Sequence, residues 1–205
     1  MNTILTEVAA RIITVEERLD ILAMAMDDKD IYSVNDYLPT WVPNWSRPPD
    51  LNSEYRRFLR KIGFPLATHD NPKPCRASMD LKPQIAFQPD RDGNPDKILC
   101  ARGIRVATLG RIIRDEHDAL WRMFESTDSG LRITASHLSR PGDRVFVLFG
   151  ADEPFVLSTH PNSRISHLQG HAMLWYDGKP STILQGALIG QLQQGKALVE
   201  SVYIC

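Results

Sequence analysis

The sequence predicts an α+β fold in which amino-terminal helices pack on a mainly antiparallel β-sheet or a partly closed barrel. Apolar residues near the amino terminus recur at the three-and-four spacing of amphipathic helices. After residue 97, short β-branched and aromatic runs are separated by glycine and proline turns. Because helices and strands are segregated rather than alternating, a parallel α/β sheet is disfavoured. We expect one domain of 205 residues, with a helical front over 1–62 and a β-rich body over 97–205.

The helical front begins with an amphipathic pattern over residues 1–26. Its apolar positions are Leu5, Val8, Ala9, Ile12, Ile13, Val15, Leu19, Leu22 and Met26. Thr14 and Glu17 have the spacing of a capping box, so we expect one helix to break there and another to begin. The prolines of the following segment, 38–45, predict a stiff, extended stretch that presents two tryptophans. A further helix is expected over 52–62.

The β-rich body is predicted from short apolar runs and turn residues. We expect strands over 98–108 with a bulge at Gly103, and over 144–149, 155–157, 166–168, 173–176 and 198–204, together with helices over 115–124 and 183–192. The run over 144–149 is almost continuously apolar, which is typical of a strand buried on both faces.

Composition and charge narrow the classes of partner. The chain has 24 basic and 25 acidic residues and a net charge of −1, so it offers no global attraction to nucleic acid or to an anionic membrane. It contains neither a signal-peptide pattern nor an apolar run long enough to span a membrane, so we expect a cytoplasmic protein. Cys75, Cys100 and Cys205 are too scattered for a disulfide framework or a structural zinc site.

Motifs of cofactor and metal enzymes are missing from the sequence. There is no glycine-rich dinucleotide motif, Walker loop, zinc-protease helix or nucleophile elbow, and we expect no cofactor and no metal. His167 and His171 would share one face of a helix, but Gly170 and the β-prone neighbours favour a strand with ordinary polar side chains. The four tryptophans suit either a packed core or the wall of an apolar pocket, and composition leaves both open.

Four short motifs lie along the chain, and each occurs once. They are Leu-Pro-Thr-Trp-Val-Pro-Asn-Trp over 38–45, Leu-Cys-Ala-Arg-Gly-Ile-Arg-Val over 99–106, Pro-Gly-Asp-Arg-Val-Phe-Val-Leu-Phe-Gly over 141–150 and Pro-Phe-Val-Leu over 154–157. Together they resemble the region that follows the HET domain in fungal heterokaryon incompatibility (HET) proteins. The resemblance runs from about Glu16 to the end.

The resemblance implies a fungal protein made of this downstream module without the HET domain, which the family associates with incompatibility and cell death. We therefore do not expect the cell-death activity here. The chain departs from the family pattern where Asn44 replaces Asp, where His171 replaces the Glu of a Gly-Glu-x-Tyr motif, and where Gly-Lys-Pro-Ser over 178–181 replaces Met-x-Gly-Glu.

The first functional hypothesis is a cofactor-independent cyclase or isomerase of fungal secondary metabolism, of which a pericyclase of Diels–Alderase type is one example. Its substrate would be an apolar terpenoid or polyketide intermediate. Such a reaction needs a shaped apolar pocket and one or two hydrogen-bond donors. The candidate substrate-binding residues are Trp41, Trp45, Trp121 and Trp175, and the candidate donors or proton-transfer groups are His171 and Tyr176.

The second hypothesis is a non-catalytic module that regulates a full-length HET protein through its aromatic and acidic amino-terminal surface. Self-association into a homo-oligomer is left open. An enclosed, indole-lined chamber would favour the enzyme, and a solid interior would favour the binding module.

Overall fold

The computed structural model describes residues 2–19, 21–27, 38–43, 75–94, 97–115, 121–159 and 163–205. The helices are α1 (Asn2–Glu16), α2 (Ile21–Asp27), the 3-10 helix η1 (Thr182–Gln185) and α4 (Ala187–Gln193). The strands are β1 (Ile85–Gln88), β2 (Ile98–Asp115), β3 (Trp121–Ser126), β4 (Arg132–Ser136), β5 (Arg144–Leu148), β6 (Phe155–Thr159), β7 (Ile165–Tyr176), β8 (Lys179–Pro180) and β9 (Val199–Ile204). The helix expected over 52–62 lies outside the described residues.

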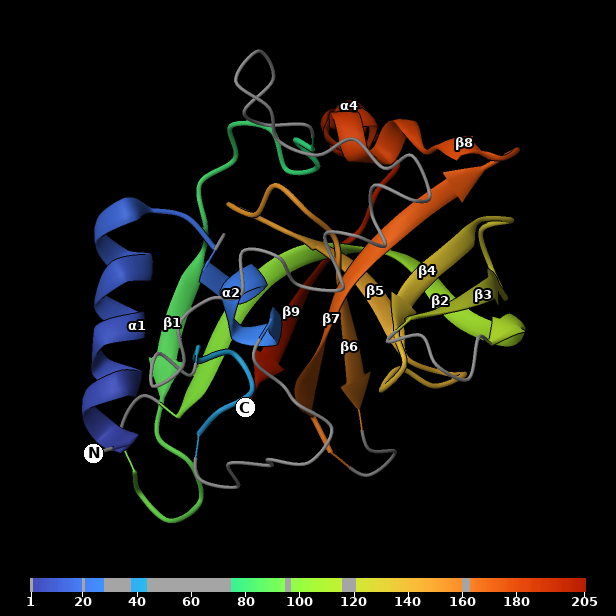
Figure 1. The fold of residues 1–205 in the computed structure, drawn as a ribbon. Coiled ribbons are helices and arrows are strands. Elements are labelled where there is room, and N and C mark those ends of the chain that lie inside the picture. The colour runs from blue at the N-terminus through green and yellow to red at the C-terminus, as the bar shows by residue number, and fades with distance from the viewer. Residues whose placement is uncertain are drawn as a thin grey trace.

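Six strands form a closed ring in the order β2-β3-β4-β7-β6-β5, because β5 pairs back onto β2. Every pairing within this ring is antiparallel. The α+β prediction of helices on an antiparallel sheet or partly closed barrel is therefore confirmed (Figure 1). β2 makes the closure possible because it has 18 residues: its first part pairs with β1 and β9, its middle with β5 and its end with β3.

The interior of the ring is filled by side chains. One buried cluster draws members from all six ring strands, among them Ala107, Leu109, Phe124, Ile133, Ala135, Val145, Val156, Ala172 and Leu174. A closed sheet of about eight strands has an interior just wide enough for side chains to fill, and a ring of six strands is narrower still. The ring is thus a packed core and not an enclosed chamber.

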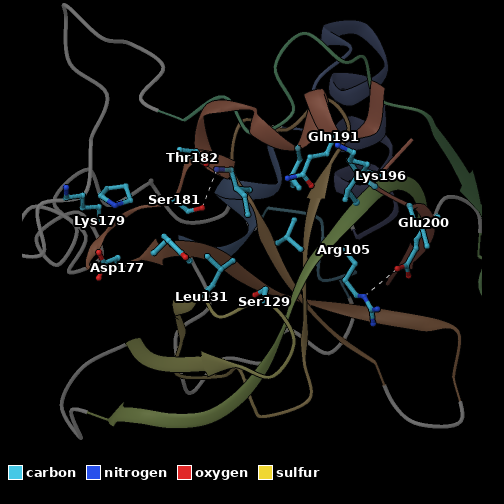
Figure 2. Close-up of a pocket in the computed structure, with 18 residues that line it drawn as sticks. Arg105, Ser129, Leu131, Asp177, Lys179, Ser181, Thr182, Gln191, Lys196 and Glu200 are labelled. Carbon is cyan, nitrogen blue, oxygen red and sulfur yellow. Dashed lines mark hydrogen bonds and ion pairs between the residues drawn. The ribbon is translucent and has the colours of Figure 1, made fainter. Parts of the chain in front are cut away.

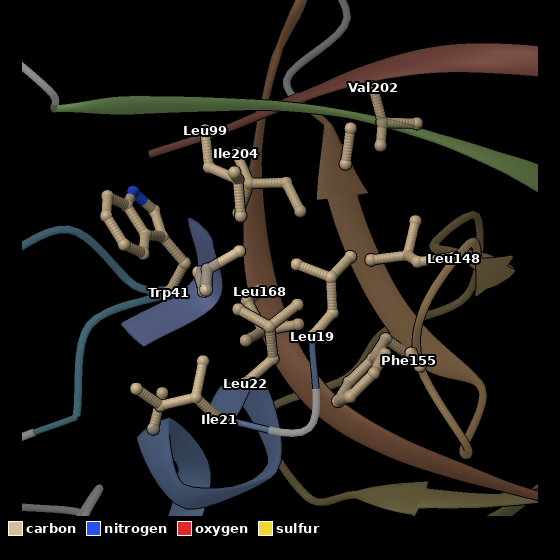
Figure 3. Packing of buried hydrophobic residues seen from close by; sticks show 14 of the residues in the cluster. Leu19, Ile21, Leu22, Trp41, Leu99, Leu148, Phe155, Leu168, Val202 and Ile204 are labelled. Carbon is tan, nitrogen blue, oxygen red and sulfur yellow. The ribbon is translucent and has the colours of Figure 1, made fainter. Parts of the chain in front are cut away.

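A second buried cluster joins the amino-terminal helices to the outside of the ring (Figure 3). Leu19, Leu22 and Trp41 pack there with Leu148 of β5 and Leu168 of β7. A third, smaller cluster places α4 over another part of the same strands, through side chains that include Leu188, Ile104 and Val147. Neighbouring residues of β5 therefore enter clusters on opposite faces, which explains its continuous apolar sequence.

The break between α1 and α2 lies where it was predicted, but the capping box is wrong. Thr14 lies inside α1, and its hydroxyl donates to the carbonyl oxygen of Ala10 at 2.8 Å. The helix ends instead at Glu16, and Glu17 turns the chain with a φ of +50°.

The helix expected over 115–124 is also wrong for its described residues. Asp115 ends β2, and β3 begins at Trp121. Phe124 is fully buried opposite Ile133 of β4 and Ile112 of β2, so pairing on both sides overrides the helical spacing of its neighbours.

Two smaller expectations about the strands are corrected by the register. The shift in the β2–β5 ladder lies between Arg105 and Ala107, not at Gly103. Gly103 instead permits close packing, because a Cβ there would lie 2.7 Å from the carbonyl oxygen of Val147. The strands predicted over 166–168 and 173–176 are one continuous strand, β7.

Candidate functional site

A cleft of about 810 Å³ lies where the β7–β8 hairpin, η1 and α4 face the strands β2 and β9 (Figure 2). This volume is within the range of pockets that hold small organic molecules. It is open to solvent.

The floor of the cleft is apolar. It is made by Ile104 and Val106 of β2, Leu131 before β4, Ile183 of η1 and Leu188 of α4. Val106 and Ile183 each pack against both the ring cluster and the α4 cluster. The floor is therefore backed by two buried cores, which hold its shape.

Charged side chains lie at the two ends of the cleft. Figure 2 shows Arg105, Lys196 and Glu200 at one end and Asp177 and Lys179 at the other. The Arg105 Nε atom is 3.6 Å from the Glu200 Oε1 atom, and both side chains are more than a third exposed. A pair this long and this exposed contributes little to stability.

The β7–β8 turn sets the position of the second end. Asp177 and Gly178 have φ values of +48° and +73°, as the two central residues of a type I′ hairpin turn require. The turn brings Tyr176 opposite Lys179 in the strand register. Ser181 then begins η1, because its hydroxyl accepts a hydrogen bond from the backbone N–H of Ile183 at 3.3 Å.

Of the two candidate donors, the structure places Tyr176 in the cleft and His171 elsewhere. Tyr176 lines the cleft and is 64% exposed. His171 is buried, with its Nδ1 atom 2.5 Å from the Oε2 atom of Glu153 and its ring stacked on Phe155 at 5.5 Å. Burial opposes the ionisation of Glu153, but the neighbouring imidazole outweighs it, and the pKa of Glu153 is lowered.

The described tryptophans do not come together around a cavity. Trp41 is fully buried beneath the helices, where its Nε1–H donates to the Lys97 carbonyl oxygen at 3.2 Å. Trp121 and Trp175 are half-buried against the ring cluster, and the Nε1–H of Trp175 donates to the Thr134 hydroxyl at 3.1 Å. Trp45 lies outside the described residues.

The histidine pair considered from the sequence lies on a strand. His167 and His171 are four residues apart in β7, about 13 Å along an extended chain, so they do not share a ligand site. Within the described part of the chain, no three side chains of His, Cys, Asp or Glu group as metal ligands would. In the same ranges, no helix has the length and apolar character needed to cross a membrane.

Sequence reasoning missed Arg105, Lys196 and Glu200 as residues of one site. Arg105 and Glu200 come together only through the register of β2 with β9, which no local pattern reveals. The Asp-Gly dipeptide at 177–178 was a usable signal, because it is a strong indication of a two-residue hairpin.

Comparisons with known proteins found no relative of this chain. No family model, no curated protein and no solved structure matches the chain. The resemblance to the HET family stays a prediction from the motifs.

Proposed function

We propose that the protein binds a small organic molecule in the cleft between the β7–β8 hairpin, α4 and β9. The observation that carries this proposal is the combination of an apolar floor, backed by two packed cores, with charged groups at both ends. Pockets of this kind take up the body of an organic ligand on the apolar surface and orient it through a few polar groups.

A matched pair of substitutions on α4 tests whether the cleft is the site. Gln191 lines the cleft, whereas the side chain of Gln193, exposed on the same helix, is not part of the lining. Gln191→Trp would fill part of the cleft with an indole, and Gln193→Trp adds the same group outside it.

The probe is the neutral dye 1-anilinonaphthalene, excited directly at wavelengths where tryptophan does not absorb. We expect the wild type and Gln193→Trp to bind it with the same affinity and Gln191→Trp to bind at least about fivefold more weakly, since an indole occupies the space that the dye needs. Equal binding by all three proteins, or no binding by the wild type, would overturn the proposal.

The packed ring and the dispersal of the described tryptophans count against an enclosed, indole-lined chamber, so the enzymatic hypothesis rests on the open cleft, where Tyr176 is the candidate proton donor. Its phenol lines the cleft and lies across the hairpin register from Lys179, which makes it the candidate donor placed beside the proposed ligand. We propose that, in a cofactor-independent isomerisation or cyclisation of an apolar intermediate, Tyr176 donates the hydrogen bond or proton to a substrate oxygen.

Incubation with a panel of carbonyl-bearing terpenoid and polyketide intermediates tests this reaction. We expect the wild type to change the product ratio relative to buffer and Tyr176→Phe to lose that change. Product ratios equal to those of buffer would contradict catalysis on these substrates, and the binding proposal would be judged separately by the dye titration.

A further inference from the structure

The cleft has an uneven distribution of charge. Its lining contains three cationic side chains, Arg105, Lys179 and Lys196, and two carboxylates, Asp177 and Glu200. The end formed by Asp177 and Lys179 is balanced, with one cation and one carboxylate, whereas the end formed by Arg105, Lys196 and Glu200 offers two cations beside one carboxylate. The Asp128 carboxylate, outside the lining, also interacts with the charge of Arg105, which helps to lower the pKa of Asp128. The two ends would therefore treat a charged ligand differently.

The cationic groups at the end formed by Arg105, Lys196 and Glu200 are available to a ligand. The contact of Arg105 with Glu200 uses the Nε atom, and the terminal guanidinium nitrogens donate to no other group within the described ranges. The Lys196 side chain has no carboxylate within ion-pair distance among the residues that the structure places. A guanidinium with free terminal N–H groups can bind a carboxylate through two parallel hydrogen bonds.

The apolar floor leads away from this end. Val106 follows Arg105 in β2, and Figure 2 shows Leu131 between the two charged ends. Ile183, also in the lining, belongs to η1, which directly follows the hairpin that carries Tyr176. A molecule with one anionic group and an apolar body therefore fits the cleft with its anionic group at the end where Arg105 and Lys196 supply two cations.

We propose that the ligand of the cleft is an amphipathic organic anion whose negative group is held by Arg105 and Lys196 and whose apolar body lies over Val106 and Ile183 toward Tyr176. This inference rests on the proposed function, because it identifies the class of molecule that the same cleft binds. Glu200 limits the affinity by competing for Arg105.

The test compares two dyes with the same rings, neutral 1-anilinonaphthalene and anionic 8-anilinonaphthalene-1-sulfonate. We expect the wild type to bind the sulfonate at least about fivefold more tightly than the neutral dye, because the anion gains charge-assisted hydrogen bonds. This preference should fall as salt is added, since the cationic groups are partly exposed.

Three substitutions and one matched control locate the anionic group. Arg105→Gln and Lys196→Gln should each weaken sulfonate binding about three- to tenfold and leave the neutral dye unchanged, because each removes one cationic contact. Glu200→Gln should tighten sulfonate binding. Lys179→Gln makes the same change of charge at the balanced end and should alter sulfonate binding by less than about twofold.

Each outcome bears on one proposal. If Gln191→Trp weakens both dyes but the wild type does not prefer the sulfonate, the cleft is a binding site and the anion inference is wrong. If Lys179→Gln weakens sulfonate binding as much as Lys196→Gln, the proposed orientation is wrong. If Gln191→Trp weakens neither dye, the proposed function itself fails. Unchanged binding of the neutral dye serves as the check that each variant is folded.

Discussion

His171 and Glu153 form a short contact between β7 and the turn that precedes β6, with the imidazole Nδ1 atom 2.5 Å from the carboxylate. The His171 ring also stacks on Phe155, which belongs to the cluster beneath the helices. The His171 side chain is 6% exposed against 46% for Arg105 of the cleft, whereas the carboxylate partners Glu153 and Glu200 are similarly exposed, at 32% and 37%. Loss of the His171–Glu153 contact should therefore destabilise the fold more than loss of the Arg105–Glu200 pair.

The Glu153–His171 contact predicts a pH dependence of stability. The pKa of Glu153 is lowered in the folded protein, since burial, which raises it, is outweighed by the charge and hydrogen bond of His171. The stabilisation is therefore complete above the pKa of the unfolded Glu, near 4.5, and is lost as the pH falls through the lower folded pKa.

We expect Glu153→Gln to lower the free energy of unfolding at pH 6 by about 1–3 kcal/mol and by less at pH 3, which lies below the pKa of the unfolded Glu, so that part of the stabilisation is already lost there. Urea denaturation of both proteins at the two pH values measures this. A difference that does not shrink at pH 3 would contradict the assignment. His167→Gln, on the exposed side of the same strand, is the control and should change little at either pH.

Trp41 is predicted to act in the core and not in ligand binding. Trp41→Phe removes the hydrogen bond to the Lys97 carbonyl and part of the packing on Phe87, and should cost about 1–2 kcal/mol. Trp41→Ala should cost about 3–5 kcal/mol. Chemical denaturation measures both values. Folded Trp41→Phe should bind 1-anilinonaphthalene as the wild type does, and weaker binding would mean that the indole contributes to the site after all.

Alanine substitutions at two glycines that flank β5 distinguish the cost of backbone strain from the cost of a steric clash. Gly142 and Gly150 have φ values of +95° and +86°, so alanine at either position should cost about 1–2 kcal/mol in backbone strain. At Gly150 a Cβ would also lie 2.7 Å from the Cδ atom of Pro83, whereas Gly142 has open space. We expect Gly150→Ala to be less stable than Gly142→Ala by at least about 1 kcal/mol in thermal or urea unfolding. Equal losses would show that the Pro83 ring moves aside freely.

Cys75 is predicted to be chemically inert in the native protein. Burial raises the pKa of its thiol to about 12, and the nearby charges of Glu153 and Asp152 add to the effect. The thiolate, which is the reactive form, is therefore almost unpopulated at pH 8. We expect iodoacetamide to label Cys75 only after unfolding, whereas the more exposed Cys100 reacts earlier. Mass spectrometry of the labelled peptides checks this, and native labelling of Cys75 at the unfolded rate would contradict it.

The sequence was sufficient to predict those elements whose residues all lie in similar surroundings. The continuous apolar run of β5 is buried on both faces, and its strand was predicted almost to the residue. The break after α1 was also predicted, although for the wrong reason, since Thr14 bonds within its own helix. Local patterns carry this information because they reflect the immediate surroundings of a few consecutive residues.

The features that the sequence did not predict depend on pairing between strands far apart in the chain. Met123 and Phe124 fit a helical spacing in isolation, but hydrogen bonding to β2 and β4 makes them part of a strand. The cleft depends on register, because Arg105 and Glu200 are almost one hundred residues apart in the sequence and meet only across β2 and β9. Residue types alone directed attention to the tryptophans, of which Trp41 belongs to the core.

Because β2 is long, it contributes side chains to all three buried hydrophobic clusters. The strand gives Leu99 to the cluster under the helices, Leu109 to the ring interior and Ile104 to the surface under α4, so each hydrophobic layer is built on the same stretch of backbone. Loss of packing in any one of these clusters would expose part of β2 to solvent and so weaken the other two clusters, which pack on the same strand. Heat should therefore unfold the chain in a single cooperative step, with the central amides of β2 the last to exchange their hydrogens.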